Sequence, residues 1–359
     1  MKIVSRYITA AYLRMLSLCI GSFIAIYLVI DFLEKIGKFS RAGGEPQVMA
    51  LFFLYKIPEI LNQITPLAVL MATMLTLGVL SRNSEIVAMR GCGISLVRIT
   101  APILIAAFFI SLFTLFSAEL IVPKSFERMK YIEDVLIAKK SPNTFFRQQN
   151  IWYREENSTL QARLFDPATR TLKGVTLWRF GAEMSPTTRI EASQGILSSD
   201  HWLLKDVAVR EFAGGNVVRS ATVREMPVYL HLKIDDLRVL GKYTDNMGFL
   251  ELRRYCEKLE KGGYDATRYR AQMHSKISLP FASLVMAFLG IPFALRGGRT
   301  SGIALGIGVS LGIGFGYFMI NAVVLSFGQG GVLSPLISAW AANFLFAAVG
   351  VWLAMTVNR

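Results

Sequence analysis

The sequence predicts an α-helical membrane protein with six transmembrane helices, three on each side of an inserted all-β domain. The first observation is composition: 53% of the 359 residues are hydrophobic, 18% are charged and the mean hydropathy is +0.44, which argues against a water-soluble protein. The second is the distribution of charge. Of the 64 charged residues, 45 lie between Pro123 and Lys276, whereas the stretch from Thr300 to Asn358 contains none. We therefore expect the middle of the chain in water and its two ends in lipid.

The six helices follow from the length of the uncharged stretches, because a bilayer core about 30 Å thick needs about 20 apolar residues. A turn at Gly328, Gly330, Gly331 and Pro335 divides the last stretch into two spans. The helices are predicted near residues 7–33, 58–81, 99–121, 275–295, 301–326 and 335–356. Residues 1–122 thus hold the first three spans and residues 274–359 the last three.

Basic residues near the spans predict the orientation, because Lys and Arg in short loops resist translocation. On one side a single acid, Glu85, faces nine basic residues: Lys2, Arg6, Arg14, Arg82, Arg90, Arg98, Arg296, Arg299 and Arg359. We expect this side, with both termini, to be cytoplasmic. The first span is too long for a signal-peptide core and is expected to remain as an anchor.

Residues 123–247 are predicted to form the β domain. Val, Thr and aromatic residues are frequent in 174–180, 207–212 and 217–230, and turn signals recur about every dozen residues. These signals are Asp166-Pro167, Ser185-Pro186, Ser199-Asp200 and Gly214-Gly215. This rhythm indicates a β-sandwich or a jellyroll-like domain. In 248–273 the period becomes helical and predicts an amphipathic connection back to the fourth span.

Several classes of function are disfavoured by the sequence. The net charge of +14 is divided between the central domain and the membrane parts, so it forms no continuous basic stripe and does not indicate nucleic-acid binding. Three cysteines and three histidines are scattered and indicate neither a metal nor a redox site. A lipid-modifying enzyme would need a catalytic motif such as G-x-S-x-G or H-E-x-x-H, and neither occurs. The chain also lacks a phosphate-binding loop of the Walker type, so no catalytic residue is assigned.

Two local patterns are candidates for function. Between the second and third spans, residues 83–91 predict a short helix that begins at an Asn83 or Ser84 cap and stops at Gly91. This helix is either a surface element or a docking site. The predicted fifth span carries glycines that let another helix pack closely or slide: Gly302, Gly306, Gly308, Gly312, Gly314 and Gly316.

With these elements in order, the chain resembles the LptF/LptG permeases of the lipopolysaccharide export transporter over essentially its whole length. The resemblance rests on order and spacing as much as on any single motif. Its pieces are Arg6-Tyr7-Ile8, the loop from Ser84-Glu85-Ile86 through Arg90 and Gly91 to Ile94-Ser95, Glu119 to Pro123, Tyr264 to Tyr269, Lys276, Pro280 and Gly290 to Ala294. The amino-terminal segment and the length favour the LptG member over LptF.

The resemblance implies a subunit of an ABC transporter in the bacterial inner membrane, with the β domain in the periplasm. The implied partners are an LptF-type permease, an LptB ATPase dimer, LptC and the lipopolysaccharide substrate. ATP would be used by the ATPase, and this chain is expected to bind no cofactor. The alternatives are an LptF-type subunit or an ABC-linked permease for another lipid.

The family also suggests roles for particular residues. The loop helix would dock into the ATPase through Ser84, Glu85, Arg90 and Gly91. Basic residues at the end of the first span, namely Lys35, Lys38 and Arg41, would contact lipid phosphates, or else simply reach the interface. Gly308, Gly312 and Gly316 would line a lateral gate between the permeases. Asp31 departs from the pattern, since LptG proteins can have a lysine near this position.

Overall fold

The computed structural model describes residues 2–41, 46–137, 148–155, 157–166, 171–181, 185–198, 201–213, 216–229, 247–261, 265–296 and 303–357. The chain divides into two compact units. The helical unit comprises Met1–Ile132, Asp245–Arg253 and Ala266–Arg359, and the sheet unit comprises Glu133–Thr244 and Arg254–Asp265.

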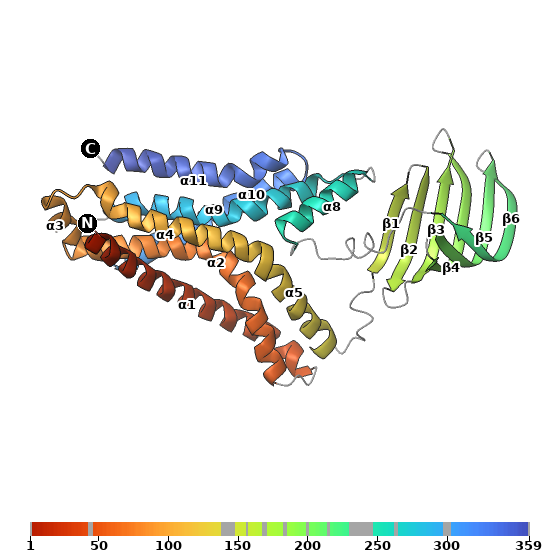
Figure 1. The fold of residues 1–359 in the computed structure, drawn as a ribbon, viewed down its shortest axis with the longest axis horizontal. Helices are drawn as coiled ribbons and strands as arrows, with labels where there is room; N and C mark the ends of the chain where they lie inside the picture. The colour runs from red at the N-terminus through yellow and green to blue at the C-terminus, as the bar shows by residue number, and fades with distance from the viewer. Residues whose placement is uncertain are drawn as a thin grey trace. The chain divides into compact units, whose positions relative to one another are not determined.

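Six helices of the helical unit are long and apolar enough to cross a membrane, which confirms the predicted number of spans. They are α1 (Lys2–Arg41), α2 (Pro46–Arg82), α4 (Leu96–Phe116), α9 (Thr267–Arg296), α10 (Ile303–Gln329) and α11 (Pro335–Val357). The turn between the last two lies where glycine and proline predict it, with Gly331 at φ 78° and Pro335 as the first residue of α11. Both termini lie at the same end of the helical unit as the short helix α3 (Glu85–Gly91) (Figure 1).

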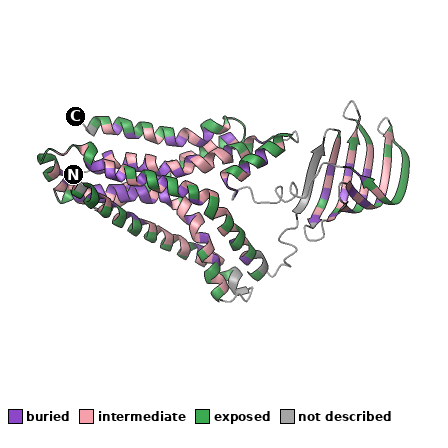
Figure 2. Cartoon of the chain, in the orientation of Figure 1, coloured by how far each residue is buried: buried purple, intermediate pink, exposed green. Residues whose placement is uncertain are grey.

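The core of the helical unit is formed mainly by α2 with α4 and α9. In the most apolar stretch of α2, 67% of the residues are buried. In the corresponding stretches of α1 and α10, 17% of the residues are buried. Gly290 of α9 permits a close approach to α2, because a Cβ at this position would lie 3.2 Å from Leu70 and Thr73. Figure 2 shows the contrast between the largely buried α2 and the largely exposed α1. Helices α1 and α10 are therefore peripheral in this chain.

Two boundaries differ from the sequence prediction. Helix α2 begins at Pro46 rather than near residue 58. The charge of Lys56 suggests that the span ends there, but Lys56 is buried and paired, so the helix continues past it. Residues expected at the start of the β domain are instead helical. A π-helix, η1 (Ser117–Ile121), joins α4 to α5 (Val122–Tyr131), and a second, η2 (Ile132–Ile137), follows. The charges of α5 mark the exit from the apolar stretch but do not end the helix.

Glu119 of η1 caps the helix that leads back to the bundle, α8 (Phe249–Lys261). Its carboxylate accepts the backbone N–H of Phe249 at 2.5 Å and that of Leu250 at 3.1 Å. A carboxylate at a helix amino terminus satisfies unpaired N–H groups and complements the helix dipole. The outgoing and returning segments of the helical unit are thereby joined.

The described residues between Gln148 and Val228 form an antiparallel β-sheet, so the predicted β insertion is confirmed for this part of the chain. Six antiparallel strands form one sheet in sequence order: β1 (Gln148–Glu155), β2 (Ser158–Asp166), β3 (Thr171–Phe180), β4 (Pro186–Ser198), β5 (His201–Ala213) and β6 (Asn216–Val228). Of the predicted turns, Ser185-Pro186 lies where β4 begins, whereas Pro167, Ser199-Asp200 and Gly214-Gly215 lie outside the described residues. The described strands form a single antiparallel meander. Its buried face centres on Trp202, Phe165 and Leu160.

Candidate functional site: the two ends of helix α1

The amino-terminal end of α1 is bonded to the loop helix α3. The Tyr7 hydroxyl donates to Glu85 Oε2 at 2.9 Å, and Asn83 Nδ2 donates to Glu85 Oε1 at 3.3 Å. The contact lies at the surface, since Tyr7 is 51% exposed. It joins residues 78 positions apart in sequence, so the predicted docking residue Glu85 already has partners within its own chain.

Helix α3 follows the predicted loop closely. Ser84 is its N-cap residue, but in a left-handed conformation (φ 61°) and without a side-chain cap hydrogen bond, so the predicted cap is correct in position only. Ile86 is buried in the core of the helical unit, whereas Val87, Arg90 and Gly91 are exposed. The helix is thus anchored by Ile86, with Met89 packed against the same core, and presents Val87, Arg90 and Gly91 outward.

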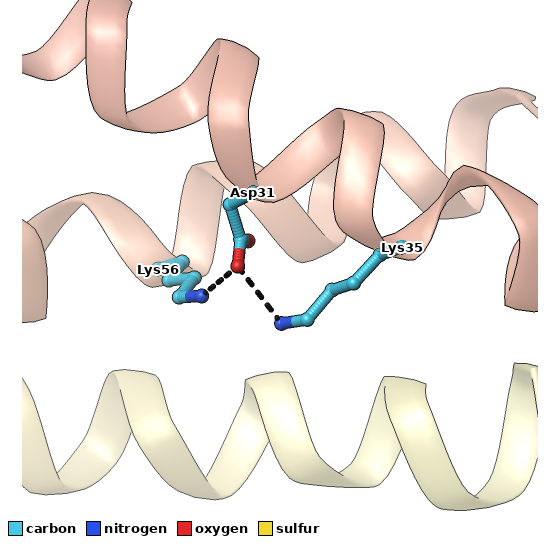
Figure 3. Close-up of polar contacts among 3 residues, drawn as sticks. All are labelled: Asp31, Lys35 and Lys56. Atoms are coloured by element: carbon cyan, nitrogen blue, oxygen red, sulfur yellow. Dashed lines mark hydrogen bonds and ion pairs between the residues drawn. The ribbon is translucent and has the colours of Figure 1, made fainter.

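The carboxyl-terminal half of α1 carries a buried ion cluster with α2 (Figure 3). Lys56 Nζ of α2 lies 2.7 Å from Asp31 Oδ1, and Lys35 Nζ lies 3.4 Å from the same oxygen. Asp31 and Lys56 are each only 8% exposed. Charges this deeply buried are tolerated only when they are paired, so Asp31 and Lys56 hold the two helices together.

Aromatic rings complete the surroundings of the two lysines. Lys35 Nζ lies 4.6 Å from the ring centroid of Phe52, and Lys56 Nζ lies 5.4 Å from that of Tyr27. Both distances are within the range of a cation–π interaction. Of the three predicted lipid-contacting residues, Lys35 therefore belongs to this cluster, while the side chains of Lys38 and Arg41 lie outside the described residues.

The glycines of α10 separate into two groups. A Cβ at Gly314 would clash with Leu67 of α2, so this glycine serves packing within the chain. A Cβ at Gly308, Gly312 or Gly316 would meet no atom of the described chain within 4 Å. These three predicted gate residues therefore lie on a part of α10 that the described residues leave open, and Gly302 lies outside those residues.

Sequence reasoning missed the functional partners of the predicted residues. Tyr7 was visible as part of a motif, but nothing in one sequence indicates which distant residue Tyr7 or Lys56 contacts. It also missed a buried polar chain in the membrane part: Tyr317 donates to Asn343 Oδ1 at 2.8 Å, and Asn343 Nδ2 donates to the Ser278 carbonyl at 2.7 Å. The one available signal was an asparagine within an uncharged span, a residue type that often hydrogen-bonds across membrane helices.

Within the described residues, no group of three His, Cys, Asp or Glu side chains is placed to hold a metal ion. Cys19 and Cys256 are buried and Cys92 is exposed, and none of the three forms a disulfide. The clusters that contain predicted site residues are those on α1: Tyr7 with Glu85, and Asp31 with Lys35 and Lys56. They can form hydrogen bonds and bind ions, in keeping with recognition and helix movement.

Comparison with known proteins gives a consistent result. Residues 6–356 match the family described as lipopolysaccharide export system permease LptF/LptG. The chain is 21% identical to LptG of Escherichia coli K12, with 98% of each chain covered, and 21% identical to LptG of Haemophilus influenzae, with 97% of each covered. It is 24% identical to LptF of Escherichia coli K12, over 93% of this chain and 92% of that one. With six apolar helices and an inserted β-sheet in the expected order, this chain belongs to the LptF/LptG family and is a multi-pass permease subunit of a lipopolysaccharide export system.

Proposed function

We propose that this chain is the LptG-type subunit of an ABC transporter that extracts lipopolysaccharide from the inner membrane. Its partners in the proposal are an LptF-type permease, an LptB ATPase dimer and LptC. The observation that carries the proposal is the match to the family over residues 6–356. LptG is favoured because the matches to LptG relatives cover more of both chains than the match to LptF.

The proposed orientation places both termini and α3 in the cytoplasm and the β domain in the periplasm. It is supported by the excess of Arg and Lys in the short loops and by the position of both termini at the α3 end of the helical unit (Figure 1). In this orientation the Asp31 cluster lies toward the periplasmic side.

Helix α3 is proposed to dock onto the ATPase, which would supply the energy of transport. Ile86 fixes the helix to the core, while Arg90 and Gly91 are exposed. Glu85 remains available for a partner, because a carboxylate has about four acceptor positions and two donors, Tyr7 and Asn83, contact it here. ATP is bound by the ATPase in this proposal and not by this chain.

Lys35 is proposed to contact a phosphate of the lipid, with Lys38 and Arg41 beside it in sequence. A lysine ammonium is a point charge suited to phosphate, and Lys35 keeps 20% of its side chain exposed. The open part of α10 with Gly308, Gly312 and Gly316 is proposed to face the partner permease and form a gate. The β domain would pass the lipid to LptC, for which β6, the exposed last strand among those described, offers a sheet edge.

The proposal is tested by purifying the chain from its own membrane in mild detergent and identifying bound proteins and lipids by mass spectrometry. A second six-span permease, an ABC ATPase and lipid A species are expected. Recovery of the chain alone, or with a different lipid, would reject lipopolysaccharide as its cargo.

An LptF-type subunit is the second candidate, because the identity to LptF of Escherichia coli K12 is 24%, above the 21% for LptG. The same purification separates the two. If the copurified permease matches LptG relatives better than this chain does, the present chain is the LptF-type subunit.

A further inference from the structure

The ion cluster between α1 and α2 contains more positive than negative charge. Two ammonium groups, on Lys35 and Lys56, share the single carboxylate of Asp31 through its Oδ1 atom (Figure 3). The other oxygen, Oδ2, is buried and has no hydrogen-bond partner. Among the described side chains the cluster thus carries one net positive charge in a largely buried place, where an uncompensated charge is costly.

The geometry shows where the surplus charge resides. Lys56 makes the shorter contact with Asp31, 2.7 Å against 3.4 Å for Lys35. Lys56 is also the more buried, with 10% of its side chain exposed against 20% for Lys35. Asp31 therefore neutralises Lys56, and the surplus charge belongs to Lys35.

We propose that Lys56 is a positioning residue that occupies Asp31 and thereby leaves Lys35 free to bind an anionic group. This inference rests on the proposed function, in which that group is a phosphate ester of the transported lipid. Lys56 itself does not contact the lipid. Asp31 lies one helical turn before Lys35, so without Lys56 it would pair with Lys35 and cancel its charge.

The charge count makes the inference specific. Lys56→Met leaves Asp31 and Lys35 as a neutral pair, and binding of the anionic lipid is lost. Adding Asp31→Asn to Lys56→Met returns the cluster to one positive charge on Lys35, and binding is restored. The exchanged pair, Asp31→Lys with Lys56→Asp, keeps both the interhelical ion pair and the surplus charge, so it also binds.

The test uses the assembled transporter in detergent and measures its affinity for phosphorylated lipid A, with dephosphorylated lipid A as the matched probe. Lys35→Met and Lys56→Met should each weaken binding of the phosphorylated lipid about tenfold or more, the effect of losing one charge-assisted hydrogen bond. The double variant and the exchanged pair should recover most of that loss. Affinity for dephosphorylated lipid A should stay the same in all variants.

Each outcome distinguishes a cause. A double variant as weak as Lys56→Met would overturn the inference, because Lys56 would then act on the lipid directly or through packing alone. If the variants that lose a charge do not assemble, the exchanged pair, Asp31→Lys with Lys56→Asp, still tests the inference, because this variant retains the interhelical ion pair. If Lys35→Met binds phosphorylated lipid A normally, the proposed phosphate contact itself is wrong, whereas normal binding by Lys56→Met alone rejects only the positioning role.

Discussion

The two ends of helix α1 are fastened to the rest of the chain in different ways. At the amino-terminal end, the buried side chains of Ile8 and Tyr12 pack into the core and one surface hydrogen bond joins Tyr7 to Glu85. At the other end, a buried ion pair between Asp31 and Lys56 joins α1 to α2. Packing therefore holds the first end even without its hydrogen bond, whereas the second end combines a buried ion pair with a ring contact between Phe32 and Phe53. The contact at the amino-terminal end can therefore change at a small cost in stability. Loss of a partner in the Asp31–Lys56 pair would cost much more stability.

The largest expected effect comes from removing one charge of the buried pair. Asp31→Asn leaves Lys56 charged and without its counter-ion in a place where it is 8% exposed. Breaking a buried pair in this way typically costs about 3–5 kcal/mol. Thermal unfolding of the purified protein in detergent should show a clear fall in the midpoint. Asp31→Asn with Lys56→Met should be more stable than Asp31→Asn alone, and the opposite order would mean that the pair does not fasten α1.

The glycines of α10 extend the comparison between packed and open surfaces. Gly314→Leu collides with Leu67 and should destabilise the helical unit by about 1–3 kcal/mol, as overpacking generally does. Gly312→Leu is the matched control, because a Cβ there meets nothing within 4 Å of the described chain. It should leave thermal stability unchanged but reduce lipid export in cells. Normal export by Gly312→Leu would remove Gly312 from the proposed gate.

Reversing the charge at the amino-terminal site should disturb assembly rather than folding. Glu85→Lys replaces an acceptor of two hydrogen bonds with a donor and should reduce copurification of the ATPase while membrane insertion is unaffected. Membrane fractionation and affinity purification measure the two results. A control at the exposed Val87, substituted by Ala, keeps the charge of the loop. If ATPase copurification and transport both survive Glu85→Lys, the docking role of Glu85 is wrong.

The smallest expected effect is that of Tyr7→Phe, which removes only the hydroxyl that donates to Glu85. The loss in stability should be about 0.5–1.5 kcal/mol, and less if water replaces the donor at this exposed position. ATPase copurification should be retained. If the link from α3 to α1 transmits ATPase action, ATP hydrolysis will continue while lipid release per ATP falls. An unchanged ratio would confine Tyr7 to a structural role.

The elements in lipid could be predicted well because the bilayer imposes strict demands on the chain. Six apolar stretches, the turn at Gly330 and Gly331, and the helix 85–91 were all found from local patterns. The start of α2 could not be found, because the charge of Lys56 reads as an exposed position until its partner is known. Strands β1, β2 and β4 were not identified either, since the segments picked out by their Val, Thr and aromatic residues cover only β3, β5 and β6.

The candidate site was only half accessible to sequence reasoning. Glu85 and Lys35 were identified by motif and by charge near a span. Tyr7 and Asp31 were also named in the sequence analysis, but their contacts were not predicted. Tyr7 lies 78 positions from its partner Glu85, and Asp31 lies 25 positions from its partner Lys56. Contacts at such separations depend on how helices pack, and one sequence does not encode that packing in any local pattern.

Glu119 has a consequence for protein engineering. Its carboxylate holds the backbone of Phe249, a residue 130 positions later, so the chain leaves and re-enters the helical unit at neighbouring points. A soluble insert attached in this way is modular: it can be shortened, exchanged or replaced by a linker without rethreading any membrane helix. The same six helices can therefore carry different soluble domains, provided that the hydrogen bonds between Glu119 and the start of α8 are kept.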